Sequence, residues 1–279
     1  MLFNRRKRRF ITRSRIVIVL LLLAAVLHVY ARKIEPRWIQ VTHYDVELNG
    51  LPNSLDGLKV VQLSDTHRSC KTPDYIIKKA VKLANSESPD IIVITGDFIN
   101  KGIENAKPCA EMLSKLKAPK GIYGVMGNHD CWYGAADVTR ALESKGIHVL
   151  TNKNRQVAPG LYIIGIDDVW SGHPDVNRAW SGVDEKAGQI LLSHSPLAMP
   201  VFKDRNCLAL TGHTHGGQYT IPFIPRNRLP GLRGSPYISG WYREGNVQMY
   251  VNRGIGMAVV PVRFLCRPEV TVFTLRSRK

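Results

Sequence analysis

The sequence lacks several features that mark specialised classes of protein. Its five cysteines are irregularly spaced and form no Cys-x-x-Cys pair, which argues against a disulfide framework and against a structural zinc site. It contains no internal repeat, no low-complexity tract and no recognised nucleic-acid-binding motif, so we expect a globular protein without a nucleic-acid partner. A hydrophobic fraction of 44% and a charged fraction of 22% are ordinary for such a protein.

Acidic residues are also scarce. The chain has 22 Asp and Glu against 39 Lys and Arg, and its formal net charge is +17. Residues 1–37 hold ten basic residues and one acid, which accounts for +9 and leaves +8 for the remaining 242 residues. A mildly basic globular part suits an anionic substrate or an anionic membrane surface.

The chain has no apolar run long enough for a comfortable membrane span. A basic stretch at 5–15 precedes the apolar residues 16–31, which as a helix reach roughly 24 Å at about 1.5 Å per residue. Two interpretations stay open: an uncleaved, tilted anchor, or a signal peptide cleaved after Ala31. We expect residues 1–37 to form a basic membrane-targeting segment and residues 38–279 to form the globular domain. The excess of basic residues before the run favours a cytoplasmic N-terminus, whereas free cysteines suit a cytoplasmic domain, so the membrane face stays open.

Beyond residue 38 the pattern alternates between strands and helices, which predicts an α/β layered fold with its functional residues at the carboxyl ends of the strands. We predict helices at 73–85, 105–116 and 135–145, and strands at 41–48, 59–63, 91–95, 121–126, 161–166, 190–193, 208–211, 247–251 and 269–275. Residues 219–246 are rich in Pro, Gly, Arg and aromatic side chains and are predicted to form a long functional loop or cap.

Seven side chains that favour divalent metals follow the ends of predicted strands. They are Asp65, His67, Asp97, Asn128, His194, His213 and His215. Each short motif alone is weak, because a loop Asp or a core His usually has a structural role. Together, at one edge of a sheet, they indicate a pocket for two divalent cations.

Two of these motifs carry further chemistry. Asp97 follows a buried strand, where an ionised carboxylate is costly unless it is paired or bound to metal, and its two oxygens can bridge two cations about 3.5–4 Å apart. His129 and Asp130 adjoin Asn128. In a phosphate-cleaving site a histidine can protonate or stabilise the leaving oxygen, and a nearby carboxylate can fix the histidine's tautomer.

The order of these motifs resembles that of the calcineurin-like metallophosphoesterases, over roughly residues 55–276. Gly-His-Thr-His-Gly-Gly-Gln at 212–218, Asn-Arg-Gly-Ile-Gly at 252–256 and Cys-Arg-Pro-Glu-Val-Thr at 266–271 resemble a membrane-associated bacterial branch. That branch includes YaeI- and YkuE-like phosphodiesterases and the chlamydial-type UDP-2,3-diacylglucosamine pyrophosphatase.

The resemblance implies a four-layer α/β/β/α sandwich with two mixed β-sheets. It also implies that two divalent ions are shared among the seven ligands, with Mn²⁺, Zn²⁺ and Fe all compatible. One ion would take Asp65, His67, Asp97 and His215, and the other Asp97, Asn128, His194 and His213. His129 would act on the leaving group with Asp130 as its orienting partner.

The substrate is open at this stage. Arg68 and Arg253 are candidates for binding substrate phosphate, and apolar residues among arginines in 219–246 suit an anionic lipid surface or a lipid-linked substrate. The leading hypothesis is a membrane-associated phosphodiesterase or pyrophosphatase acting on a phosphorylated lipid-linked or nucleotide-linked substrate similar to UDP-2,3-diacylglucosamine. The alternatives are a broad-specificity phosphatase of secreted or cell-wall phosphoesters, and a non-catalytic scaffold on the same fold.

Overall fold

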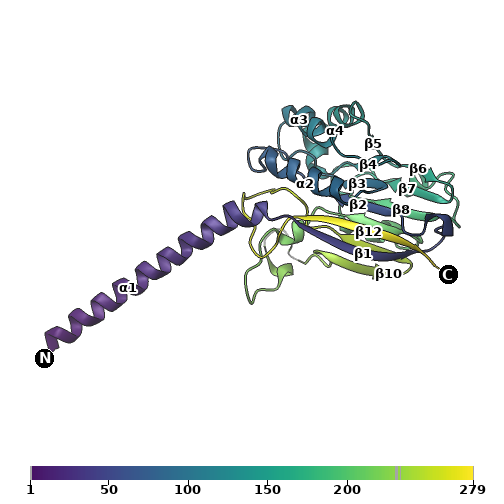
Figure 1. The fold of residues 1–279 in the computed structure, drawn as a ribbon. Helices are drawn as coiled ribbons and strands as arrows, with labels where there is room; N and C mark the ends of the chain where they lie inside the picture. Colours follow the sequence, from purple (N-terminus) through teal and green to yellow (C-terminus); the bar gives the residue numbers. More distant parts are fainter. Residues whose placement is uncertain (1, 230–231, 233, 279) are drawn as a thin grey trace.

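Two six-stranded β-sheets stacked face to face form the body of the protein (Figure 1). The computed structural model describes residues 2–229, 232 and 234–278, with side chains from Ser14 onward. Pro230, Gly231 and Arg233 of the predicted cap loop therefore lie outside the described residues. The first sheet has the order β1 (Gln40–Leu48), β12 (Glu269–Ser277), β2 (Lys59–Leu63), β3 (Ile91–Thr95), β4 (Ile122–Val125) and β5 (Ile147–Val149).

The second sheet has the order β10 (Gly240–Glu244), β11 (Val247–Val251), β9 (Leu208–Thr211), β8 (Gly188–Leu192), β7 (Leu161–Gly165) and β6 (Lys153–Ala158). Both sheets are mixed, because β12 pairs antiparallel with β2, β10 with β11, and β6 with β7. The strands β2, β3 and β4 are parallel to one another, as are β11, β9, β8 and β7. Their carboxyl ends supply the loops of the candidate site.

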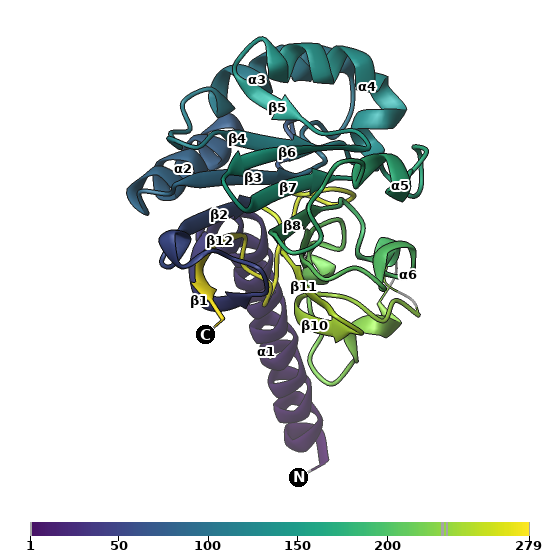
Figure 2. The same cartoon turned by 90° about the vertical axis from the view of Figure 1, so that its right-hand side faces the viewer.

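Helices cover the outer faces of the two sheets (Figure 2). The first sheet carries α2 (Asp74–Ser86), α3 (Ala106–Leu113) and α4 (Asn128–Glu143), and the second carries the short helices α5 (Val176–Ala179) and α6 (Met199–Phe202). Short 3₁₀ turns occur at Asn53–Leu55, Ile103–Asn105, Pro196–Ala198, His215–Gly217 and Arg226–Arg228. Separate apolar clusters fill the spaces beneath α2–α4, between the sheets and beneath α5–α6. The predicted four-layer α/β/β/α fold is confirmed.

Local sequence explains the core elements. All five residues of β3 are buried, as expected for a strand covered on both faces. The buried residues of α2 recur at helical spacing, from Ile76 and Ile77 to Ala80, Val81 and Ala84, so this helix presents one apolar stripe to the sheet. Truncating Ile92 at the centre of β3 to alanine would destabilise the fold by about 2–5 kcal/mol, as other buried large-to-small changes do.

The long N-terminal helix α1 (Leu2–Val29) projects away from the sandwich and continues through a π-helical turn at Tyr30–Ile34 and a 3₁₀ turn at Glu35–Arg37 (Figure 1). The 24-residue helical segment Ser14–Arg37 is long and apolar enough to cross a membrane, and the mean hydropathy of its most apolar 18-residue window is 2.2. This helical segment extends beyond both ends of the apolar run at 16–31, which alone is short for a membrane span. Glu35 and Pro36 are buried against the domain.

Three strands were not predicted. Strand β5 has only three residues, and β6 and β10 lie at sheet edges with mostly half-exposed side chains, so neither shows a buried apolar run. Strand β10 also lies inside the stretch predicted as a cap loop. Helix α4 begins at Asn128 rather than at 135, and its interruption at Gly134 (φ 127°) hides the helical periodicity from the sequence.

Candidate metal centre

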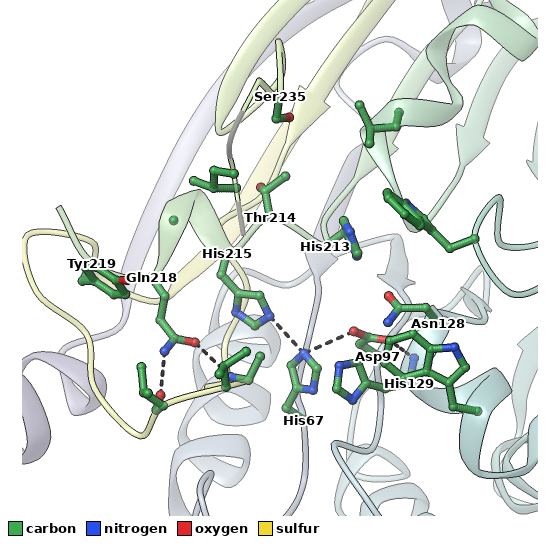
Figure 3. A pocket seen from close by; sticks show the side chains of 18 of the residues that line it. His67, Asp97, Asn128, His129, His213, Thr214, His215, Gln218, Tyr219 and Ser235 are labelled. Carbon is green, nitrogen blue, oxygen red and sulfur yellow. Dashed lines mark hydrogen bonds and ion pairs between the residues drawn. The ribbon is translucent and has the colours of Figure 1, made fainter. Parts of the chain in front are cut away.

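All seven predicted metal ligands converge where the two sheets meet at the carboxyl ends of their parallel strands. Asp65 and His67 follow β2, Asp97 follows β3, and Asn128 opens α4 directly after β4. His194 follows β8, and His213 and His215 follow β9. Figure 3 shows five of them, with the imidazoles of His67, His213 and His215 facing the carboxylate and amide of Asp97 and Asn128.

One cluster joins Asp65, His67 and His215. His67 Nε2 lies 2.9 Å from His215 Nε2, and both nitrogens face Asp65 Oδ1, at 3.8 and 3.3 Å. The three side chains present metal-binding atoms within 4.8 Å of one another. All three residues are buried.

A second cluster joins Asp97, His194 and His213, with Asn128 beside them. His194 Nε2 lies 3.3 Å from Asp97 Oδ2, 3.1 Å from Asn128 Oδ1 and 3.1 Å from His213 Nδ1. Asp97 also links the second cluster to the first, because its Oδ2 atom lies 3.2 Å from His67 Nε2. His129 donates its backbone N–H to Asp97 Oδ1 at 2.9 Å, which leaves Oδ2 to face both clusters.

These separations fit coordination of metal ions. Nitrogen ligands held at about 2.0–2.1 Å from a tetrahedral ion lie about 3.3–3.4 Å apart. The donor atoms here are 2.9–3.8 Å apart, and imidazole, carboxylate and amide donors suit Zn²⁺, Mn²⁺ and Fe. The two clusters could therefore each hold a divalent ion, with Asp97 between them.

The backbone of the site is strained. Five of the seven candidate ligands have positive φ angles between 43° and 70°, namely Asp65, His67, Asp97, His213 and His215. Such conformations cost about 1–3 kcal/mol each in residues other than glycine and cluster at functional sites. Glycines admit the close approach of the loops: a Cβ on Gly127 would lie 2.2 Å from Asp97 Oδ1, and one on Gly212 would lie 2.3 Å from Asp65 Oδ2.

Hydrogen bonds behind the ligands fix their orientation. His194 Nδ1 donates to the carbonyl of Thr95 at 2.8 Å, so its Nε2 faces the cluster without a proton when a cation binds. The Ser64 hydroxyl donates to Asp65 Oδ2 and in turn accepts from Thr95 Oγ1. The backbone N–H of His213 donates to both oxygens of Asp65.

Electrostatics show that a proton competes with a cation for the second cluster. Burial alone would lower the pKa of His194, but the adjacent Asp97 carboxylate outweighs it and raises this pKa to about 10. Burial alone would raise the pKa of Asp97, but His194 and His67 hold it well below its usual range. Burial, with charged His194 nearby, lowers the pKa of His213 to about 3. The site without metal therefore carries a proton on His194 that a cation must displace.

His129 lies beside the ligands, but Asp130 does not orient it. The Nδ1 atom of His129 donates to the backbone carbonyl of Asn100 at 2.7 Å. Asp130 instead accepts from the backbone N–H groups of Phe98, Ile99 and Gly127. These three hydrogen bonds make Asp130 a buried clamp between the loops after β3 and β4. Burial and the nearby Asp97 raise the pKa of Asp130 to about 7. The predicted tautomer-fixing role of Asp130 stays a prediction that this geometry does not favour.

The two arginines predicted to bind phosphate have partners elsewhere. Arg68 Nε lies 3.2 Å from Asp74 Oδ1, and its guanidinium also donates to Asn105. Arg253 Nε donates to the buried Glu269 at 3.0 Å, and its Nη2 donates to Gln40. Neither arginine is among the described residues that line the cavity over the ligands, so their substrate-binding role stays a prediction that the geometry does not favour.

A cavity of about 610 Å³ opens above the ligands, within the size range of small-molecule sites. Two tryptophans in its lining, both more than half exposed, were not singled out from the sequence. Trp132 packs against the ring of His129, with centroids 4.9 Å apart, and lies one helical turn after it. Trp170 lies near His213 and is held by Asp168, which accepts its backbone N–H. The three-residue spacing between His129 and Trp132 could have identified Trp132 as a neighbour of the site from the sequence. Trp170 lies in the loop after β7, where no sequence pattern marks it.

Comparisons with known proteins identify the family to which the sequence is similar. The family profile described as calcineurin-like phosphoesterase matches residues 58–217, a segment that contains all seven candidate ligands. The chain is 37% identical over 260 residues to the uncharacterized metallophosphoesterase YkuE of Bacillus subtilis, covering 89% of each protein. It is 32% identical over 280 residues to a transmembrane protein with metallophosphoesterase domain of Danio rerio, covering 93% of this chain and 62% of that protein. It is 27% identical over 302 residues to the UDP-2,3-diacylglucosamine pyrophosphatase LpxG of Chlamydia muridarum, covering 88% and 91%.

Proposed function

Since the chain belongs to the calcineurin-like phosphoesterase family and is a metal-dependent phosphoester hydrolase, we propose that it cleaves a phosphodiester or pyrophosphate bond in a lipid-linked or nucleotide-linked substrate at a membrane. A UDP-2,3-diacylglucosamine-like molecule is the model substrate, as the name of the chlamydial relative suggests.

We assign the two clusters to two divalent ions. One is held by Asp65, His67, Asp97 and His215, and the other by Asp97, Asn128, His194 and His213. When bound, the ions supply an activated water and neutralise charge on the phosphoryl oxygens. Imidazole, carboxylate and amide donors bind Mn²⁺, Zn²⁺ and Fe alike, so metal analysis of the purified chain is needed to identify the ions.

His129 is the residue we assign to the leaving oxygen. Its Nδ1 is engaged by the carbonyl of Asn100, so the opposite nitrogen, Nε2, is the one that can meet substrate. Burial lowers the pKa of His129, so a neutral ring can take up at Nε2 the proton that the attacking water loses and can pass that proton to the departing oxygen.

The residues that line the cavity are the main support for the proposed class of substrate. Beside the ligands, the cavity lining includes Trp132, Trp170, Tyr219, Val259 and Val260. A phosphomonoester offers one organic group, whereas a diester or pyrophosphate offers one on each side of the reacting phosphorus. Aromatic and aliphatic walls suit a base, a sugar or an acyl group.

The N-terminal helix supports a membrane location. Ser14–Arg37 has the length and composition of a membrane span, and none of its most apolar window is buried in the protein. We propose that it anchors the catalytic domain beside a lipid surface, with the cleaved signal sequence as the alternative. The interfacial location would bring a lipid-linked substrate to the cavity without release into water.

A substrate panel with added Mn²⁺ tests the proposal. Bis-nitrophenyl phosphate, nitrophenyl phosphate and a UDP-diacylglucosamine are offered to the purified full chain. Cleavage of the diester and the pyrophosphate without monoesterase activity supports the proposal. Preferential turnover of nitrophenyl phosphate would instead support the broad-specificity phosphatase.

A further inference from the structure

We propose that two loops beside the cavity form a membrane-docking face, through which a lipid-linked substrate passes directly from the bilayer to the metal centre. The docking face comprises residues 218–224 and 257–266. This inference rests on the proposed function and adds the surface and the route by which the substrate arrives.

The two loops form one hydrogen-bonded unit. The Gln218 side chain donates to the carbonyl of Val260 at 2.6 Å and accepts from the N–H of Ala258 at 2.9 Å, and Figure 3 shows both bonds. The backbones also pair, because Thr220 N donates to Phe264 O and Phe264 N donates to Gln218 O, at 2.8 and 3.2 Å. These bonds join the two loops into one surface.

This unit is joined to the base of the N-terminal helix. The backbone N–H of Arg263 donates to the carbonyl of Ala31 at 2.9 Å, and the ring of Phe264 meets that of Tyr30 edge to face. The fully buried Glu35 carboxylate accepts the N–H groups of Leu265 and Cys266. These bonds fix the exit of the helix against the docking face, and Figure 1 shows α1 leaving the sandwich from the end where these loops lie.

The outer side of the docking face is apolar. Phe223 is fully exposed, Leu265 is half exposed, and Ile221 and Ile224 are 43% and 42% exposed. Phe223 and Leu265 also adopt positive φ angles, 68° and 52°, a conformation that costs free energy in a bulky residue. Strain that keeps large apolar side chains in contact with water indicates a surface that is covered in use.

The bilayer is the occupant that the surroundings favour. The only candidate membrane span among the described residues ends at this face, so the lipid surface must lie close to it. Two cations lie beside the docking face: the Lys71 ammonium binds the carbonyls of Ala258 and Val259, and Arg226 donates to Thr220 in the loop that carries Phe223. Apolar tips among cations match the boundary between acyl chains and anionic headgroups.

The inner side of the same loops is the cavity wall. Gln218, Tyr219, Ala258, Val259 and Val260 line the cavity that also contains His67 and His215. One side of a thin pair of loops thus faces the bilayer and the other faces the metal ligands. A substrate whose acyl chains stay in the lipid can extend its phosphate into the site along this wall.

Depth-dependent quenching tests contact of the docking face with lipid. The full chain, with exposed Cys70 replaced by serine, carries an NBD-labelled cysteine at Phe223→Cys and is reconstituted into vesicles of phosphatidylethanolamine and phosphatidylglycerol. The matched control is Asn246→Cys, an exposed position in the turn before β11 at the opposite end of the strands. Lipids with an acyl-chain nitroxide should quench the label at 223 and leave the label at 246 almost unchanged. Equal quenching at both positions would overturn the inference.

Rates of hydrolysis test whether a lipid-linked substrate reaches the metal centre along the docking face. Transfer of a Phe side chain from water into an apolar phase is favoured by a factor of about ten or more. Phe223→Glu removes this contribution to lipid binding, so it should lower the rate of hydrolysis of vesicle-borne UDP-diacylglucosamine about tenfold. Hydrolysis of bis-nitrophenyl phosphate should not change, and Asn246→Glu should change neither. An unaltered lipid rate in Phe223→Glu contradicts the route. If the wild-type chain cleaves no lipid-linked or nucleotide-linked substrate, the proposed function fails, and the quenching result still decides whether the face contacts lipid.

Discussion

Comparing Gly96→Ala with Gly146→Ala separates two effects of an added methyl group: crowding of the atoms at the metal centre, and strain in the backbone of the substituted residue. Gly96 precedes Asp97 and has a φ of +85°, and a Cβ there would lie 2.7 Å from His194 Nδ1 and 2.8 Å from Gly127 N. Gly146 has a similar φ of +80°, but a Cβ there would meet nothing within 4 Å. The two alanine variants therefore carry similar strain and differ in what the added methyl group touches.

The expected magnitudes follow from these two contributions. A left-handed conformation costs an alanine about 1–2 kcal/mol relative to glycine, so Gly146→Ala should lose about that much stability. Overpacking in a well-packed interior adds about 1–3 kcal/mol, so Gly96→Ala should lose about 2–5 kcal/mol in total. The displaced atoms include the ring of His194, and the site geometry should be lost together with stability.

Urea unfolding of the metal-free protein measures the stabilities, and Mn²⁺-dependent cleavage of bis-nitrophenyl phosphate measures the site. We expect Gly146→Ala to keep its turnover at conditions where it is folded, and Gly96→Ala to lose most of it even when folded. If the two variants lose equal stability and keep equal activity, the close approach of the loops after β3, β4 and β8 is not required for the site.

Three further predictions concern the leaving group, the pH dependence and the anchor. His129→Ala should slow cleavage of esters with poor leaving groups far more than nitrophenyl esters, and equal losses in steady-state assays would remove His129 from the leaving-group role. Because the pKa of His194 is raised to about 10 in the folded state from about 6.5 when unfolded, its stabilisation of the metal-free protein should be present below pH 6.5 and lost as pH rises toward 10. Urea midpoints across that range test this, and a His194→Gln variant should lack the dependence. Deleting residues 2–29 should move the protein from the membrane to the soluble fraction and spare cleavage of bis-nitrophenyl phosphate, and membrane retention in high salt would show that the docking face binds lipid without the helix.

The ligand set was predictable from sequence because each ligand lies within four residues of the end of a recognisable buried strand. Residues such as Asp97, after Ile91–Thr95, take their position from the strand, and parallel strands bring their carboxyl ends together. No knowledge of side-chain contacts was needed for that step.

Partners that come from other loops were not predictable. The orientation of His129 depends on a backbone carbonyl of Asn100, a group that every residue possesses, so adjacency to Asp130 was misleading. The predicted role of Arg253 overlooked Glu269, sixteen residues away, which pairs with it only after β11 and β12 are placed. The link between Glu35 and Leu265 spans even more of the chain. Contacts of this kind require the tertiary structure.

The metal content of the purified full chain, measured together with that of Asp97→Asn, tests the central claim most directly. Asp97 Oδ2 faces both clusters, at 3.2 Å from His67 and 3.3 Å from His194. We predict about two transition-metal ions per chain in the wild type, and loss of both bound metal and hydrolysis in Asp97→Asn. A wild-type chain that holds no transition metal after reconstitution, or an Asp97→Asn variant that keeps full occupancy and full activity, would contradict a shared dinuclear centre.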